Sequence, residues 1–282
     1  MDSTAHTRAV FVVGSPRSGT SALAWAIGQH PEMATGPEAD FPFYVAKLFE
    51  THEAPALHPP RDLAPLETAW QVSRQREDGW VNENDVSRDE FMAAIGSGLD
   101  RLMSSRYGGK RWVDSTPVAA IVLPQLAKLF PEALFIHILR DGRAAVSSME
   151  RSGFDVRVAK DFRFACETWE HCVRKAHAFS LERPDRCLEI RQELLASDPE
   201  AAMAEVMPFL GLDECPAAVA YLKAGRINSS WGNKSPGDVR KTKPHDVVPE
   251  APWGDWTPDQ KETFESVAAE TMELVGYDCT LD

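Results

Sequence analysis

The chain has 282 residues and is 43% hydrophobic, which is enough to build a substantial core. Its formal net charge of −13 repels nucleic acid, so we expect any anion to bind at a local site of backbone N–H groups and arginines. Its five cysteines form no CxxC pair, so we expect free thiols, no metal centre and a cytoplasmic location. No apolar run is long enough to span a bilayer, so we expect no membrane span.

Apolar patterning predicts the elements of the first part of the chain. A short β-branched run predicts a buried strand over Ala9–Val13, and the residues after it predict a helix over Ser18–Gln29. A second helix is expected over Phe41–Glu50, and the prolines of residues 54–65 predict an irregular loop. A capping-box pattern then marks the start of a helix over Arg88–Ser105.

The rest of the chain alternates strands with helices. Strands are predicted over Arg111–Asp114, Leu134–Leu139 and Cys187–Ile190. Helices are predicted over Pro117–Phe130, Gly142–Met149, Asp161–Glu182, Pro199–Leu210 and Pro258–Val275. Residues 224–256 are rich in Gly, Pro, Asn and Trp, and we assign them no regular structure. The alternation predicts an α/β fold with a P-loop-like, mainly parallel central sheet flanked by helices, and we expect residues 1–282 to form a single domain.

A glycine-containing loop follows the first predicted strand. Its residues, GSPRSGTS from Gly14 to Ser21, place two glycines around four residues, as in the Walker loop GxxxxGK[ST]. Such a loop aims successive N–H groups at one point, and the following helix adds its positive end, so an anion is expected there. The Walker lysine is replaced by Thr20, and the positive charge lies earlier, at Arg17.

The segment GSPRSGTSALAWAIGQHPEMATGPE resembles the 5′-phosphosulfate loop of the sulfotransferases that use 3′-phosphoadenosine-5′-phosphosulfate (PAPS). It is most similar to the branch with protein-tyrosine sulfotransferases and bacterial relatives, whose pattern is PRSGT(T/S), then His-Pro, then a glycine–glutamate segment. The resemblance implies transfer of a sulfuryl group from PAPS to a hydroxyl or amine of a small-molecule, peptide or sugar acceptor. By this likeness the donor is bound by Arg17, Ser18, Gly19, Thr20 and Ser21, and Arg17 also serves catalysis.

A second anion site is expected at the end of the strand Leu134–Leu139. Arg140 follows that strand, where open parallel sheets bind ligands, and Ser148 lies two turns into the next helix on roughly the same face. The pair resembles the family's motif for the 3′-phosphate of PAPS, which implies that Arg140 and Ser148 bind this phosphate. A salt bridge between Arg140 and Asp141 or another carboxylate is the alternative. Arg151 is a candidate for the further arginine of the tyrosine-sulfotransferase branch.

The candidate general base is Glu38, which falls where the family segment Gly-Glu-Glu has its second glutamate. Asp40 and Glu32 are the alternatives nearby. We expect His137, in a buried strand, to be a core residue, and His30 to close the first helix.

Other segments resemble the family in part. Ser115 replaces the lysine of the family's Asp-Lys-Thr-Pro segment, and Gln192 stands where relatives have a nucleotide-contacting tyrosine. The resemblance also implies that Ser229 contacts the cofactor. We expect three tryptophans to pack against neighbouring side chains, with stacking on adenine or lining of the acceptor pocket as the alternatives: Trp231, Trp253 and Trp256.

Two other functions compete with sulfuryl transfer. A P-loop kinase or NTPase would use the same type of loop, but it needs the missing lysine and has no use for a 3′-phosphate site. A non-catalytic nucleotide-binding protein of the same fold is the other alternative. The acceptor cannot be named from the sequence, and we expect loops at about residues 54–86 and 224–256 to select it.

Overall fold

The computed structural model describes residues 8–49, 65–75, 79–152, 156–224 and 252–281. Its centre is a five-stranded sheet in the order β2-β3-β1-β4-β5, in which every paired strand is parallel to its neighbour. This confirms the predicted α/β fold with a parallel central sheet. The strands span Val10–Gly14 (β1), Met33–Thr35 (β2), Arg111–Asp114 (β3), Leu134–Leu139 (β4) and Cys187–Arg191 (β5).

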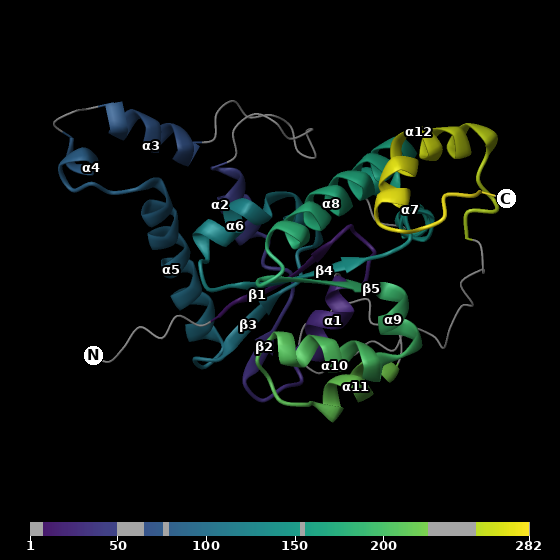
Figure 1. Ribbon diagram of the computed structural model, residues 1–282, viewed down its shortest axis with the longest axis horizontal. Coiled ribbons are helices and arrows are strands. Elements are labelled where there is room, and N and C mark those ends of the chain that lie inside the picture. The colour runs from purple at the N-terminus through teal and green to yellow at the C-terminus, as the bar shows by residue number, and fades with distance from the viewer. Residues whose placement is uncertain (1–7, 50–64, 76–78, 153–155, 225–251, 282) are drawn as a thin grey trace.

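Helices cover both faces of the sheet, and α3 and α4 lie at the end opposite α7 and α12 (Figure 1). The α-helices span Thr20–Ile27 (α1), Phe41–Lys47 (α2), Pro65–Gln75 (α3), Trp80–Glu83 (α4), Arg88–Arg106 (α5), Leu123–Leu129 (α6), Gly142–Glu150 (α7), Phe162–Glu182 (α8), Gln192–Ser197 (α9), Pro199–Phe209 (α10), Pro216–Lys223 (α11) and Pro258–Leu274 (α12). Two 3₁₀ helices span Pro117–Val122 (η1) and Arg157–Ala159 (η2). None of the helices in these ranges is long and apolar enough to cross a membrane.

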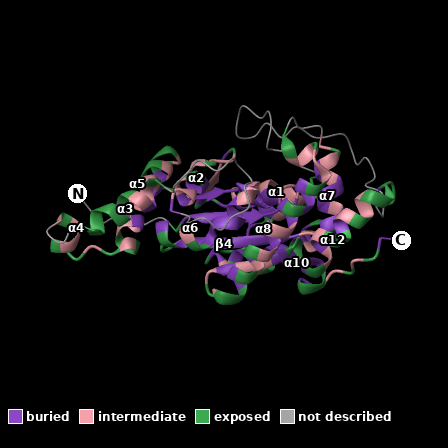
Figure 2. Cartoon of the chain, turned by 90° about the horizontal axis from the view of Figure 1, so that it is seen from above, coloured by how far each residue is buried: buried purple, intermediate pink, exposed green. Residues whose placement is uncertain are grey.

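The side chains of β1 alternate between two buried clusters, because successive residues of a strand point to opposite faces. Phe11 and Val13 pack with α2, α5, η1, α6 and α8, whereas Val10 and Val12 pack with α1, α9, α10 and α11. Figure 2 shows the central strands buried and the exposed residues on the outer sides of the helices. The strands are therefore covered on both sides, which is why they are continuous apolar runs.

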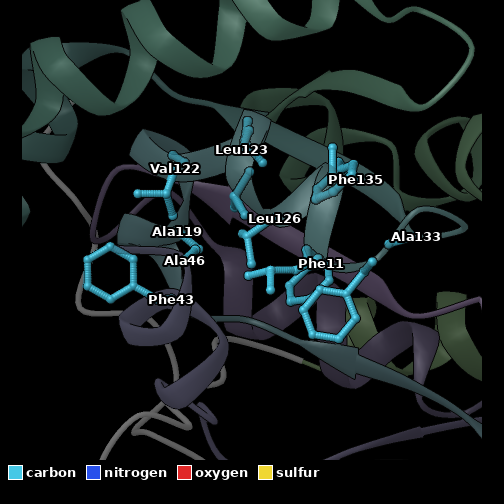
Figure 3. Close-up of a cluster of buried hydrophobic side chains, with 14 of the residues drawn as sticks. Phe11, Phe43, Ala46, Ala119, Val122, Leu123, Leu126, Ala133 and Phe135 are labelled. Atoms are coloured by element: carbon cyan, nitrogen blue, oxygen red, sulfur yellow. The ribbon is translucent and has the colours of Figure 1, made fainter. Parts of the chain in front are cut away.

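Phe11 belongs to the first cluster, part of which is drawn in Figure 3. Its ring is 5.4 Å from the ring of Trp112, 5.2 Å from Phe130 and 5.6 Å from Phe135, measured between centroids. Replacing a buried phenylalanine of this kind by alanine costs about 3–5 kcal/mol. This cluster joins β1, β3 and β4, whose carboxyl ends carry the loops described below.

The structure corrects several predicted elements. The three-residue strand β2 was not predicted, because so short a segment shows no periodicity. The helix expected from Ser18 begins at Thr20, since Gly19 has a left-handed φ of 100°. The helix expected over Pro117–Phe130 is divided into η1 and α6, because Pro124 has no N–H to continue the ladder.

Short helices were also missed. The predicted acceptor loop at about residues 54–86 contains α3 and α4 in its described part. Neither α9 nor α11 was predicted, because both helices are too short to show a clear 3.6-residue periodicity in the sequence. Most of the other predicted loop, residues 225–251, lies outside the described residues.

Candidate functional site

The loop after β1 is held in a compact shape by its glycines. A Cβ atom at Gly14 would lie 2.6 Å from the carbonyl oxygen of Ile138 and 2.7 Å from Ser18 Oγ, so only glycine allows this approach to β4. Arg17 and Gly19 have left-handed φ values of 69° and 100°. Gly19 is the N-cap of α1 and has no side chain to cover the positive end of that helix, where an anion would bind.

The hydroxyl residues of this loop differ in exposure. Ser18 is fully buried, its N–H donates to the carbonyl oxygen of Ser15, and its Oγ has no hydrogen-bond partner in the described part of the chain. Thr20 is also buried, whereas Ser21 is partly exposed. The structure therefore confirms the predicted order of strand, loop and helix, whereas the sequence did not distinguish buried from exposed hydroxyls.

The turn after β4 carries the second predicted anion site. Arg140 directly follows the strand, and Asp141 caps α7 by accepting hydrogen bonds from the N–H groups of Arg143 and Ala144. The Asp141 carboxylate also pairs with the Arg143 guanidinium, at 2.6 Å between Nη2 and Oδ2. The alternative pairing of Asp141 with Arg140 is thus replaced by a pairing with Arg143.

The two predicted anion sites meet in space although they are far apart in the sequence. Arg140 Nη1 donates a hydrogen bond of 2.5 Å to the carbonyl oxygen of Arg17. Arg17 Nε in turn donates to Ser148 Oγ at 3.2 Å, across 131 residues of sequence. The loop after β1 and the turn after β4 therefore form one polar surface at the carboxyl ends of two neighbouring strands, the usual ligand-binding position of such a sheet.

The segment with Glu38 follows β2 and lies at the same edge of the sheet. Glu38 is partly exposed. The next residue, Ala39, donates its N–H to Asp114 Oδ1 at 2.8 Å, and Asp40 donates its N–H to Thr116 Oγ1 at 3.2 Å. Glu32 precedes β2 and therefore lies at the amino end of the strand, away from the loops that carry Arg17 and Arg140.

Comparison with known proteins identifies the family. The sequence model described as "Sulfotransferase family" matches residues 9–216. The chain belongs to the sulfotransferase family. This confirms the resemblance found in the loop after β1, and it favours sulfuryl transfer over a P-loop kinase or NTPase.

The names of similar proteins agree with this family assignment. The sulfotransferase chain is 27% identical over 279 residues to protein-tyrosine sulfotransferase 1 of Danio rerio, covering 95% of this chain and 72% of the relative. It is 29% identical over 211 residues to protein-tyrosine sulfotransferase 2 of Gallus gallus, covering 72% of this chain and 51% of the relative.

Solved structures share the fold at low sequence identity. A sulfotransferase domain from the curacin biosynthetic pathway matches with a TM-score of 0.56 and 16% identity, covering 96% of this chain and 98% of that one. Mouse sulfotransferase SULT7A1 complexed with PAP matches with a TM-score of 0.51 and 16% identity, covering 95% of this chain and 84% of that one. These matches show that the sulfotransferase fold extends over nearly the whole chain.

Other predicted residues of the sulfotransferase lie in different surroundings. Gln192 lies beside the loop after β1, since a Cβ atom at Gly19 would be 3.4 Å from its Cγ. Ser115 is buried after β3. Arg151 Nη1 donates to the carbonyl oxygen of Pro252 at 3.1 Å. Ser229 lies outside the described residues.

The three tryptophans singled out from the sequence of the sulfotransferase lie in different environments. Trp256 is buried, contacts Phe264 and donates to Glu150, so it packs rather than lining a pocket. The ring of Trp253 lies under the guanidinium of Arg143, 4.2 Å from its Cζ. Trp231 lies outside the described residues.

A carboxylate shared by two histidines was not predicted. His137 is fully buried, as expected, and its Nδ1 is 2.9 Å from Glu189 Oε2, which is also 2.9 Å from His177 Nδ1. Burial alone would raise the pKa of Glu189, but the hydrogen bonds and charges of His137 and His177 lower it to about 2. His137 lies opposite Glu189 in the β4–β5 register, and this contact could not be predicted because the sequence does not reveal which strands are neighbours.

In the described ranges no group of three or more His, Cys, Asp or Glu residues is arranged to hold a metal ion. All five cysteines have free thiols, and four of them are buried.

Proposed function

We propose that this sulfotransferase transfers the sulfuryl group of PAPS to a hydroxyl group of its acceptor and releases 3′,5′-phosphoadenosine. The observation that carries the proposal is the contact between the two anion-binding segments. Arg140 donates to the backbone of Arg17, and Arg17 donates to Ser148. A donor with a phosphosulfate at one end and a 3′-phosphate near the other needs two neighbouring cationic sites, whereas a nucleoside triphosphate needs only the first.

Each segment has a part in holding the donor. The N–H groups of Gly19, Thr20 and Ser21 and the positive end of α1 attract the phosphosulfate, whereas the Ser18 N–H donates within the loop. Arg140 and Ser148 are assigned to the 3′-phosphate. Arg17 lies between the two groups, and its guanidinium has a fork of five N–H donors, enough to contact Ser148 and an oxygen of the sulfuryl group.

Glu38 is assigned the role of general base. As the acceptor oxygen forms its bond to sulfur, the Glu38 carboxylate takes the proton of the acceptor hydroxyl. The bond between sulfur and the bridging oxygen breaks, and its electron pair stays on the 5′-phosphate. Arg17 and the loop N–H groups stabilise the charge that develops on that phosphate, so positioning and electrostatics supply most of the catalysis.

The first acceptor to test is the phenol of a tyrosine in a peptide. The relatives described above are named protein-tyrosine sulfotransferases, and one of them aligns with 95% of this chain. Small phenols, amines and sugar hydroxyls are the other acceptor classes. The compartment remains a prediction: free thiols favour a reducing one such as the cytoplasm.

The test is transfer of label from sulfur-labelled PAPS to a panel of tyrosine peptides, small phenols, amines and sugars. We expect one class to gain a sulfuryl group, identified by mass, with release of 3′,5′-phosphoadenosine. Arg140→Ala should weaken binding of PAPS. Transfer of a phosphoryl group from ATP, with none from PAPS, would contradict the proposal, and tight binding of PAPS with no transfer to any class would favour a non-catalytic nucleotide-binding protein.

A further inference from the structure

Two side chains that follow β3 hold the backbone on both sides of the peptide that links Ala39 to Asp40. Ala39 N–H donates to Asp114 Oδ1 at 2.8 Å, across 75 residues of sequence. Asp40 N–H donates to Thr116 Oγ1 at 3.2 Å, across 76 residues. These are the two residues directly after Glu38, so the position of Glu38 depends on a segment from the neighbouring strand.

The two anchoring side chains also fix each other. Thr116 Oγ1 donates to Asp114 Oδ1 at 3.2 Å, and the Thr116 N–H donates to Asp114 Oδ2, also at 3.2 Å. Asp114 is 4% exposed and Thr116 is 1% exposed. Because the threonine hydroxyl donates to one group and accepts from another, its orientation is determined, and the pair acts as one rigid acceptor for the Glu38 segment.

The anchored backbone is strained. Asp40 has φ 55° and ψ −43°, and the N–H of Phe41 donates to the carbonyl oxygen of Ala39 at 2.5 Å. This is a γ-turn with positive φ at its central residue, a rare conformation for a residue other than glycine. Strained turns of this kind persist only where the surrounding structure determines them, and they concentrate at functional sites.

The anchor also has an electrostatic cost. Burial raises the pKa of Asp114, although the hydrogen bonds from Ala39 and Thr116 oppose that shift. In the described part of the chain Asp114 has no ion pair that would offset this cost. A buried carboxylate whose described hydrogen bonds all come from Ala39 and Thr116 is better explained by positioning than by stability.

We propose that Asp114 and Thr116 are positioning residues, which set the place of the Glu38 carboxylate relative to Arg17. The inference rests on the proposed function of Glu38 as general base. It gives the segment Asp114-Ser-Thr116 a role that does not require the lysine replaced by Ser115.

The test compares three variants at these positions. Thr116→Val keeps the volume but removes the acceptor of the Asp40 N–H, and Asp114→Ala removes the acceptor of the Ala39 N–H. We expect each to lower kcat about 10–100-fold, since misplacing a reacting group by about 1 Å can cost as much as about 100-fold. The Kd for 3′,5′-phosphoadenosine, which Arg140 and the first loop hold, should change less than about twofold. Thr116→Ser restores the hydroxyl and should recover most of the rate.

A matched control is Asp100→Ala. Asp100 is also buried and accepts a hydrogen bond from Trp112 Nε1 at 2.8 Å, but it lies on α5. This variant should lose stability while keeping its turnover per folded molecule. The same preparations give a readout without activity: hydrogen exchange of the Ala39 and Asp40 amides should accelerate in Asp114→Ala and Thr116→Val but not in Asp100→Ala.

Combination with Glu38→Gln tests whether the anchor acts through Glu38. If it does, Asp114→Ala and Thr116→Val should lower the residual rate of the Glu38→Gln protein by less than about threefold, since the base they position is gone. The inference would be overturned if the rate losses of the anchor variants and of Glu38→Gln multiplied in the combined proteins. Unchanged amide exchange, or a Thr116→Val protein with the parent kcat, would also overturn it. A parent protein that transfers sulfate to no acceptor would instead remove the proposed function, an outcome distinct from an active parent with unaffected variants.

Discussion

Arg17 Nε donates a hydrogen bond of 3.2 Å to Ser148 Oγ, which joins the loop after β1 to the helix after β4. The backbone of the same arginine accepts from Arg140. The residues assigned to the two ends of the donor are thus in direct contact. We therefore expect nucleotide recognition to depend on both segments together.

The first prediction concerns discrimination between nucleotides. The parent protein should bind 3′,5′-phosphoadenosine at least about tenfold more tightly than AMP, because a charge-assisted hydrogen bond contributes roughly 1.5–3 kcal/mol. Arg140→Ala should remove most of this preference. Calorimetry with both nucleotides measures it, and Arg163→Ala, at an exposed arginine of α8, is the control. Equal affinities for the two nucleotides in the parent would refute the 3′-phosphate assignment.

The second prediction concerns the general base. Glu38→Gln keeps the size of the side chain but cannot accept a proton, so turnover should fall by roughly 10²–10⁴-fold with little change in donor affinity. Steady-state and single-turnover rates with labelled PAPS measure the effect. Glu32→Gln is the matched control, because Glu32 precedes β2 and is exposed. If Glu38→Gln works at the parent rate, Asp40 becomes the next candidate.

The third prediction is that transfer needs no divalent metal. A sulfuryl group carries less negative charge than a γ-phosphate, so Arg17 and the loop N–H groups should be enough to stabilise its transfer. Activity should survive EDTA and should not rise with added magnesium. A rate that EDTA abolishes and magnesium restores would point to metal-assisted chemistry at the loop after β1.

The fourth prediction concerns Glu189 and pH. Its pKa is lowered from 4.5 to about 2 in the folded protein by His137 and His177. The stability that it contributes should be complete above pH 4.5 and should decrease as pH falls toward 2, because the unfolded chain then binds the proton first. Glu189→Gln should cost roughly 1–3 kcal/mol at pH 6 and less at pH 3.

Urea unfolding of both proteins at several pH values measures this difference. Glu167→Gln, in an exposed pair with Arg163, is the control and should cost less than about 1 kcal/mol at either pH. A Glu189→Gln cost that stays constant from pH 6 to pH 3 would show that the histidines do not hold the carboxylate in its charged form.

The parts of the site that the sequence predicted are those with a local signal. The glycine loop after β1 was predicted because its glycines and Arg17 lie directly between a strand and a helix. The position of Arg140 was predicted because this residue directly follows a continuous apolar strand. The anchoring of Glu38 was not predictable, because Asp114 and Thr116 bind backbone N–H groups, which carry no sequence signal. The contact between Arg17 and Ser148 likewise requires knowledge that β1 and β4 are neighbours.

The order of strands in the sheet also has a consequence for biosynthesis. The loop after β1 leaves the ribosome before its partner Ser148, which is made 131 residues later. At about 5–20 residues per second, this delay is on the order of ten seconds. During that time the nascent chain carries only the first part of the proposed donor site. Pairing β1 with β4 also requires contacts of large sequence separation, which form slowly. A nucleotide that binds only after β1 and β4 have paired would stabilise the folded sheet relative to the partly folded chain.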